Sequence, residues 1–262
     1  MTLNGVGVVC ALVAEARHLG PRLERLTAAQ PAGGQATGSA CPQITTLHDG
    51  TLLAVSGMGA PAAHRAAEAL ISRGARALAS WGMAGGLDPA LEAGTICLPD
   101  EVMGQDGICS HTTRPWCDTL SSAVGDQQSL HRGRLLTTAA PVSSPAQKAA
   151  LFAQTGAAAV DMESAAIGQV AGRSGLPFIA VRVIVDAAND SLPRAVMNAA
   201  DAAGRIRLWQ LVGSLARAPA DLAPVLRLAR RYQCASRSLA AVARSGRLAR
   251  DAFSCAAESL HA

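Results

Sequence analysis

The sequence is poor in aromatic residues and lacks the glycine motifs of common nucleotide sites. It contains three Phe, three Trp and one Tyr among 262 residues. Proteins that hold single-stranded nucleic acid stack its bases on aromatic side chains, so we expect no nucleic acid partner. No GxGxxG or GK[ST] sequence is present, which excludes the usual dinucleotide site and the P-loop.

Cysteines and apolar runs also lack the patterns of secreted, metal-binding or membrane proteins. The seven cysteines include no CxxC pair, and an odd, scattered set is typical of reduced thiols in the cytoplasm. Cys109, His111 and Cys117 have no fourth ligand at zinc spacing, so we expect no metal. The apolar segment near the N-terminus is short and is interrupted by Glu15, and no basic region precedes it. It therefore differs from a signal peptide. No apolar run reaches bilayer-spanning length.

Charge is distributed unevenly along the chain. Half of the residues are hydrophobic, which suits one sizeable α/β core with an appendage. Residues 1–200 contain 13 Lys and Arg against 15 Asp and Glu, whereas residues 201–262 contain 10 against 4. We therefore predict a catalytic domain over 1–200 and a basic helical extension over 201–262.

Short apolar segments that end in glycine alternate with segments free of helix breakers. This alternation predicts an α/β fold with a mainly parallel, mixed sheet flanked by helices. The expected strands are Val6–Leu12, which runs into a loop holding Glu15, the segments TLLAVSGMG from Thr51 and ALASWGMAGGLDP, and Leu91–Pro99; the expected helix is Ala62–Ser72. Residues 28–42 predict a loop, and residues 104–134 are polar and irregular.

Three acids stand where such a fold places ligand sites. AAAVDMESAAIG, residues 157–168, puts Asp161 and Glu163 at the start of an alanine-rich helix, where N–H groups and the helix dipole favour negative charge. The apolar run Phe178–Val185 predicts a buried strand that ends at Asp186. Ligands of open α/β sheets bind at the carboxyl ends of strands. Asp161 alone is better explained as a helix cap than as a catalytic group.

Two glycine turns, Ser56–Gly59 and Gly82–Gly86, follow expected strands. Glycine lets a ligand approach the backbone and hydrogen-bond to its N–H groups. Tight strand exits would need the same glycines, so both interpretations stay open. Separated carboxylates in one pocket suit cleavage of an N-glycosidic bond, which needs an acid for the leaving purine, a group that holds the ribose and a base for water.

AVDMESAAIG followed by VRVIVDAAND, together with GMAGGL and an AxxxE after the first strand, resembles the nucleoside phosphorylase and methylthioadenosine/S-adenosylhomocysteine nucleosidase superfamily. The resemblance implies that Glu163 grips the ribose hydroxyls, with Met162 under the sugar. It implies that Asp186 protonates the purine N7 and that Glu15 orders the attacking water. Arg182 matches a strand arginine that orients the acids.

The expected substrate-binding residues come from these motifs and from the glycine turns: Met162, Asp161, Gly57, Met83, Ala84, Gly85, Val142 and Arg182. Some positions depart from the family pattern. Met83 replaces a serine of the nucleosidases, and Pro141 and Val142 stand where an aromatic residue stacks on adenine. Ser80 and Trp81 replace the phosphate-binding arginine of the bacterial purine phosphorylases. We expect no cofactor, and phosphate remains a candidate co-substrate beside water.

APVSSPAQKAALFAQTGAAAVDMES, the SLPRAV turn and the basic C-terminus resemble the hopanoid-associated phosphorylase branch. That resemblance implies removal of adenine from adenosylhopane, whose 5′ end is a pentacyclic lipid, and a wide apolar entrance. Two alternatives remain: a methylthioadenosine/S-adenosylhomocysteine or futalosine nucleosidase, and a nucleoside-binding module without activity. The intact Glu163 and Asp186 argue against the second.

Apolar residues recur at helical spacing in the tail, with arginines on other faces. The two stripes are Leu208, Leu211, Val212 and Leu215, and Val225, Leu228, Ala229 and Tyr232. Such helices either dock on the core or contact a membrane surface. We expect a cytoplasmic homo-oligomer that acts on a small-molecule or lipid-linked adenosine, and contact with the inner membrane through the tail is one of the two alternatives.

Overall fold

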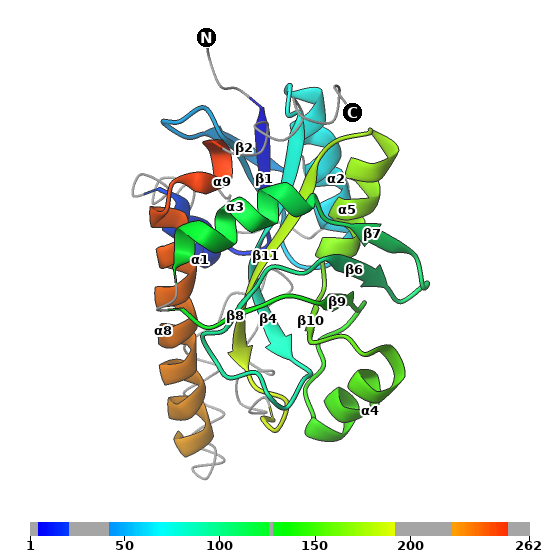
Figure 1. Cartoon of the computed structure of the whole chain (residues 1–262), viewed down its shortest axis with the longest axis vertical. Helices are drawn as coiled ribbons and strands as arrows, with labels where there is room; N and C mark the ends of the chain where they lie inside the picture. Colours follow the sequence, from blue (N-terminus) through cyan, green and yellow to red (C-terminus); the bar gives the residue numbers. More distant parts are fainter. Residues whose placement is uncertain (1–4, 21–41, 126–127, 192–221, 251–262) are drawn as a thin grey trace, which may run out of the picture.

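The computed structural model describes residues 5–20, 42–125, 128–191 and 222–250, and it confirms an α/β fold with a mixed sheet flanked by helices (Figure 1). The main strand path runs β2-β3-β1-β4-β10-β9-β6-β7; β11 pairs with β4 and β5, and β8 pairs with β5. The strands are β1 Val6–Cys10, β2 Gln43–Thr46, β3 Leu52–Val55, β4 Ala77–Gly86, β5 Ile96–Cys97, β6 Glu101–Gly104, β7 Cys109–His111, β8 Leu130–His131, β9 Arg134–Thr137, β10 Ala159–Asp161 and β11 Phe178–Asp186. The helices are α1 Val13–Ala16, the 3-10 turn η1 Arg17–Leu19, α2 Ala60–Ser72, α3 Arg114–Val124, α4 Pro145–Thr155, α5 Ser164–Arg173, α8 Leu222–Arg244 and α9 Arg247–Arg250.

Strand β11 is buried on both faces, as its apolar run predicts. Ile179 and Val181 belong to a core shared with α3 and α8, whereas Ala180 and Ile184 belong to a core shared with α2 and α5. Successive side chains of a strand point to opposite faces, so the sheet lies between two helical layers. Strands β11, β4, β1 and β3 run parallel through the centre. Their carboxyl ends therefore meet at one edge.

Several predicted boundaries are wrong in detail. The first strand ends at Cys10, and Glu15 lies in α1 and not in a loop. The predicted strand over Leu91–Pro99 shrinks to the two-residue β5, because a turn at Gly94 (φ 97°) occupies its first half.

The supposedly irregular 104–134 segment contains β7, α3 and β8. Helix α3 buries Trp116, Cys117 and Leu120 against the central sheet. The segment is therefore structured, and its polar residues lie on the exposed face of α3 and in the turns and short strands on either side of it. The predicted loop over residues 28–42 lies almost wholly outside the described residues.

The second tail stripe lies on α8, a helix that packs on β11 and η1. Its docking buries Ala235, Leu239 and Val242, further along the helix than the stripe Val225 to Tyr232. Helix α8 is thus docked on the core, although Ala229 and Tyr232 of the predicted stripe are exposed. The first stripe and the predicted boundary near residue 200 lie outside the described residues. No helix in the described segments has the length and hydropathy to cross a bilayer.

Candidate active site

The carboxyl ends of β4 and β11 position the first acid. Register between the strands shifts so that Ile184 pairs with Ala84 and Asp186 with Gly85. A β-bulge of this kind re-aims a side chain at a strand end. A Cβ atom on Gly85 would lie 3.4 Å from Oδ2 of Asp186. The Asp186 carboxyl therefore packs directly on the glycine turn of β4.

The second acid, Glu15, reaches the same turn from α1. Its Oε1 accepts a hydrogen bond from the Met83 N–H at 2.9 Å, and its Oε2 accepts one from the Leu12 N–H at 3.0 Å. Gly82 has no room for a side chain, since a Cβ there would lie 2.6 Å from Glu15 Oε1 and would also collide with Arg182. The glycine is needed here for close approach, and not for a left-handed conformation.

The third acid, Glu163, lies just before α5. Its Oε1 accepts a hydrogen bond from the Gly59 N–H at 2.8 Å, which ties it to the first glycine turn. Its Oε2 lies 3.9 Å from Nη2 of Arg182. Glu15, Glu163 and Asp186 are only 5%, 7% and 5% exposed. Three separate chain segments thus supply three buried carboxyl groups: Glu15 and Asp186 pack on the turn of β4, and Glu163 is bonded to the Ser56–Gly59 turn.

Arg182 of β11 contacts side chains of β10, β4 and α5. Its Nη2 lies 2.7 Å from Oδ2 of Asp161 and donates to the hydroxyls of Ser80 and Ser164. Asp161 also accepts hydrogen bonds from the Thr137 hydroxyl and from the Ser164 N–H at the start of α5. Asp161 therefore caps α5 and pairs with Arg182. Its contact with a substrate stays a prediction.

Burial controls the charge of the acids. Burial raises the pKa of Glu15 against the opposing charge of Arg182. Burial and the neighbouring Asp161 raise the pKa of Glu163 to about 7, although Arg182 and the Gly59 N–H act in the opposite direction. Burial also raises the pKa of Asp186, and the ammonium of Lys148 opposes that rise. Carboxyl groups with raised pKa values can act as general acids near neutral pH.

Some predicted site residues have other uses. The Gly57 N–H (φ 82° at this residue) donates to the Ala11 carbonyl, and the Met83 N–H donates to Glu15. These two N–H groups are therefore hydrogen-bonded within the protein, as the interpretation of tight strand exits requires. Ala84 is buried, and Val142 packs against a small core at the end of β9 and β10. Met162, between Asp161 and Glu163 in the sequence, and Met83, bonded to Glu15 through its N–H, are half-buried.

Sequence reasoning assigned no role to Lys148, the only lysine in the chain. Its side chain is fully buried, and its Nζ donates to Oδ2 of Asp186 and, at 2.7 Å, to the carbonyl of Ala187. It lies 38 positions before Asp186, on a helix whose other residues are all at least partly exposed. A lysine in such a helix normally faces solvent. The one signal in the sequence that could have pointed to a role for Lys148 is that the chain has no other lysine.

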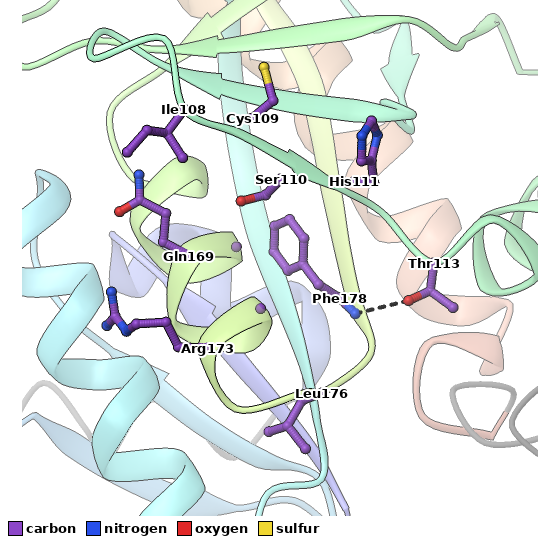
Figure 2. Close-up of a pocket in the computed structure, with 11 residues that line it drawn as sticks. Ile108, Cys109, Ser110, His111, Thr113, Gln169, Arg173, Leu176 and Phe178 are labelled. Carbon is purple, nitrogen blue, oxygen red and sulfur yellow. Dashed lines mark hydrogen bonds between the residues drawn. The ribbon is translucent and has the colours of Figure 1, made fainter.

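A surface hollow at the other end of β11 is separate from the acids. Figure 2 shows it between β7, α5 and Phe178, with side chains that include Cys109, His111, Gln169 and Arg173. Phe178 begins β11 and Asp186 ends it, so the two places are about 26 Å apart along the strand. Cys117, in contrast, is buried in α3. The described residues include no group of three or more His, Cys, Asp or Glu side chains placed to hold a metal.

Comparisons with known proteins identify the family and the fold. A family model described as the phosphorylase superfamily matches residues 6–212. No curated protein sequence matches the chain. The 5′-methylthioadenosine/S-adenosylhomocysteine nucleosidase of Colwellia psychrerythraea, in complex with adenine, has a TM-score of 0.65 and 18% identity, and the match covers 94% of this chain and 96% of that one.

Two further solved structures have similar folds. The corresponding nucleosidase of Neisseria meningitidis, in complex with methylthio-immucillin-A, has a TM-score of 0.63 and 17% identity over 93% of this chain and 99% of that one. The futalosine hydrolase of Helicobacter pylori has a TM-score of 0.63 and 16% identity over 92% and 98%. At these identities the likeness establishes the fold.

Proposed function

The chain belongs to the phosphorylase superfamily, and from this membership we propose that it cleaves the N-glycosidic bond of a 5′-substituted adenosine and releases adenine. The observation that carries the proposal is the burial of Glu15 and Asp186 against the turn of β4 and of Glu163 against the neighbouring Gly59 turn, with Arg182 in contact with Glu163. Burying three carboxyl groups near one another is costly for folding. A protein that only binds a nucleoside has no need of an acid beside the purine.

Each acid has a distinct part in the proposed reaction. Asp186 donates its proton to N7 of the adenine, so that the base leaves as a neutral molecule. Glu163 accepts hydrogen bonds from the ribose hydroxyls and balances the positive charge that develops on the ring as the bond breaks. Such contacts strengthen toward the transition state, which is what accelerates the chemical step. Arg182 holds Glu163 and Asp161 in place.

Two residues of β4, just before its glycine turn, favour water as the attacking group. Ser80 and Trp81 occupy the place of the arginine that binds phosphate in the bacterial purine phosphorylases. The Ser80 hydroxyl accepts a hydrogen bond from Arg182 at 2.7 Å, and the Trp81 indole donates to the backbone carbonyl of Glu15 at 3.1 Å. Both side chains are fully buried. We therefore assign Glu15 to ordering a water molecule at the sugar carbon.

The substrate we favour is adenosylhopane. The support is the resemblance of residues 140–164 to the hopanoid-associated phosphorylases, together with Met83 and Val142 in place of polar and aromatic pocket residues. Methylthioadenosine, S-adenosylhomocysteine and futalosine are the alternatives. The support for these is the similarity in fold to nucleosidases that are named for them.

One assay separates adenosylhopane from methylthioadenosine as substrate, and water from phosphate as the attacking group. Adenine release is measured with adenosylhopane, with methylthioadenosine and without substrate, each with and without phosphate. We expect the highest kcat/KM with adenosylhopane and a free sugar product even in excess phosphate. A preference for methylthioadenosine would favour the alternative substrate class. A sugar 1-phosphate product, formed equally by the Glu15→Gln variant, would contradict the role of Glu15, and no adenine from any adenosine would contradict the enzyme assignment.

A further inference from the structure

The contact between Lys148 and Asp186 extends the proposed function to a residue to which the sequence motifs assign no role. Helix α4 begins after Ser144, whose hydroxyl accepts a hydrogen bond from the Gln147 N–H at 3.3 Å. Lys148 lies in the first turn of this helix and is its only fully buried residue. In Figure 1, α4 lies at the end of the sheet toward which β4 and β11 point. The helix thus brings an ammonium group to the carboxyl end of β11.

A purely structural role explains this contact poorly. Moving a lysine and an aspartate out of water costs several kcal/mol per ion, and an apolar side chain of similar size often stabilises a protein at least as well. The side chains of Lys148 and Asp186 are 0% and 7% exposed. The chain has no other lysine. A buried ion pair on the residue that we assign as the general acid therefore needs a chemical explanation.

The geometry leaves one oxygen of Asp186 for the substrate. Nζ of Lys148 donates to Oδ2 and to the Ala187 carbonyl. Within the described part of the chain, Oδ1 receives no hydrogen bond, and it lies 3.5 Å from where a Cβ of Gly85 would stand. Lys148 fixes the carboxyl plane through Oδ2 and a backbone carbonyl at once. Oδ1 is the oxygen that can carry the proton for N7.

We propose that Lys148 is the positioning residue and charge partner of the general acid: it orients Asp186 and stabilises the carboxylate that forms when the proton leaves for N7. In this step the Oδ1–H bond breaks and the N7–H bond forms. The electron pair of the glycosidic bond goes to the departing adenine. Asp186 becomes a carboxylate beside the ammonium of Lys148, which keeps its protons throughout. The proposal rests on the N-glycosidic cleavage proposed above.

Charge balance around Asp186 determines the expected pH behaviour. Burial raises the pKa of Asp186, Lys148 of α4 lowers it, the nearby Asp190 raises it and Arg231 of α8 lowers it. Arg231 is itself paired with Asp190. Without the ammonium of Lys148, one of the two positive charges that lower the pKa of Asp186 is missing. This pKa therefore rises further. The acid then stays protonated to a higher pH but is a weaker donor, and catalysis is most efficient when the pKa lies near the working pH.

The test compares Lys148→Met with wild type on two leaving groups. One substrate is the adenosine cleaved fastest in the panel above, and the other is the 4-nitrophenyl riboside with the same 5′ group, whose leaving group needs no proton. We expect kcat on the adenosine to fall about ten- to a hundredfold, less than the roughly hundred- to ten-thousandfold that loss of the general acid itself would cost. We expect the alkaline limb of its pH profile to move to higher pH, and the nitrophenyl reaction to change less than threefold.

Matched variants separate chemistry from folding. Gln147→Met, at the exposed neighbour on α4, should leave both reactions unchanged. Lys148→Arg keeps the charge and should keep the alkaline limb near that of wild type, which provides a test even if Lys148→Met does not fold. Equal losses on both substrates with an unmoved limb, no loss on either, or a limb moved upward in Lys148→Arg would overturn the proposal. Absence of adenine release by wild type would instead overturn the proposed function.

Discussion

Asp186→Asn should lower kcat for adenine release by about a hundred- to ten-thousandfold, the range that general acid catalysis typically contributes. The amide has the shape of the carboxyl group and can still accept the hydrogen bond from Lys148. It has no proton to give to N7. Because binding of the substrate does not depend on that proton, KM should change much less than kcat. Steady-state kinetics with the preferred adenosine measures both quantities.

The control for this variant is Asp118→Asn. Asp118 lies on the exposed face of α3 and pairs with Arg132, so its loss should leave kcat within about twofold, as expected of a surface pair worth at most about 1 kcal/mol. If Asp186→Asn retains close to wild-type kcat, Asp186 is not the general acid. The proposed part of Lys148 would then be lost with it.

Glu163→Gln should reduce activity and increase stability together. A carboxylate that accepts hydrogen bonds from both ribose hydroxyls contributes roughly 1.5–3 kcal/mol per bond, so kcat/KM should fall at least about a hundredfold. The same carboxylate is costly for the fold. Its pKa is raised from 4.5 to about 7, so the folded state loses stability as the pH rises from 4.5 through 7, where the unfolded chain is already ionised.

The neutral amide removes that cost and can still accept the hydrogen bond from the Gly59 N–H. At one pKa unit per 1.36 kcal/mol, the gain above pH 7 is up to about 3 kcal/mol, and it should disappear below pH 4.5. Thermal unfolding of wild type and Glu163→Gln at pH 4 and pH 8 measures the difference. Glu68→Gln, on the exposed face of α2, should change neither activity nor stability. A stability loss in Glu163→Gln at pH 8 would show that its charge stabilises the fold.

The sequence predicted those parts of the fold in which one local pattern dominates. Phe178–Val185 has only one polar residue, Arg182, and only a strand between two helical layers accommodates such a run. Helix α3 was missed because most of residues 104–134 are polar, while its buried face depends on three residues. Glu15 was placed in a loop because α1 has only four residues. Its first turn is stabilised by the contact of Glu15 with the Leu12 N–H, which local periodicity does not reveal.

The candidate site was predictable where short motifs hold the reacting groups. Glu163 and Asp186 stand next to the helix and strand that carry them, so their motifs located them. Lys148 was not predictable in this way, because its role depends on α4 folding over the end of β11. The uses of the Gly57 and Met83 N–H groups inside the protein were also hidden, since they depend on side chains and carbonyls from other segments.

The most direct test of the central claim compares the preferred adenosine with its 7-deaza analogue, in which carbon replaces N7. Both bases stack and pair alike, but carbon at this position cannot accept the proton from Asp186. We predict that wild type releases adenine from the adenosine, whereas the analogue competes for binding and releases no base at a detectable rate. Release of 7-deazaadenine at a rate within about tenfold of adenine release would contradict acid catalysis at N7, since that step alone is expected to contribute at least about a hundredfold.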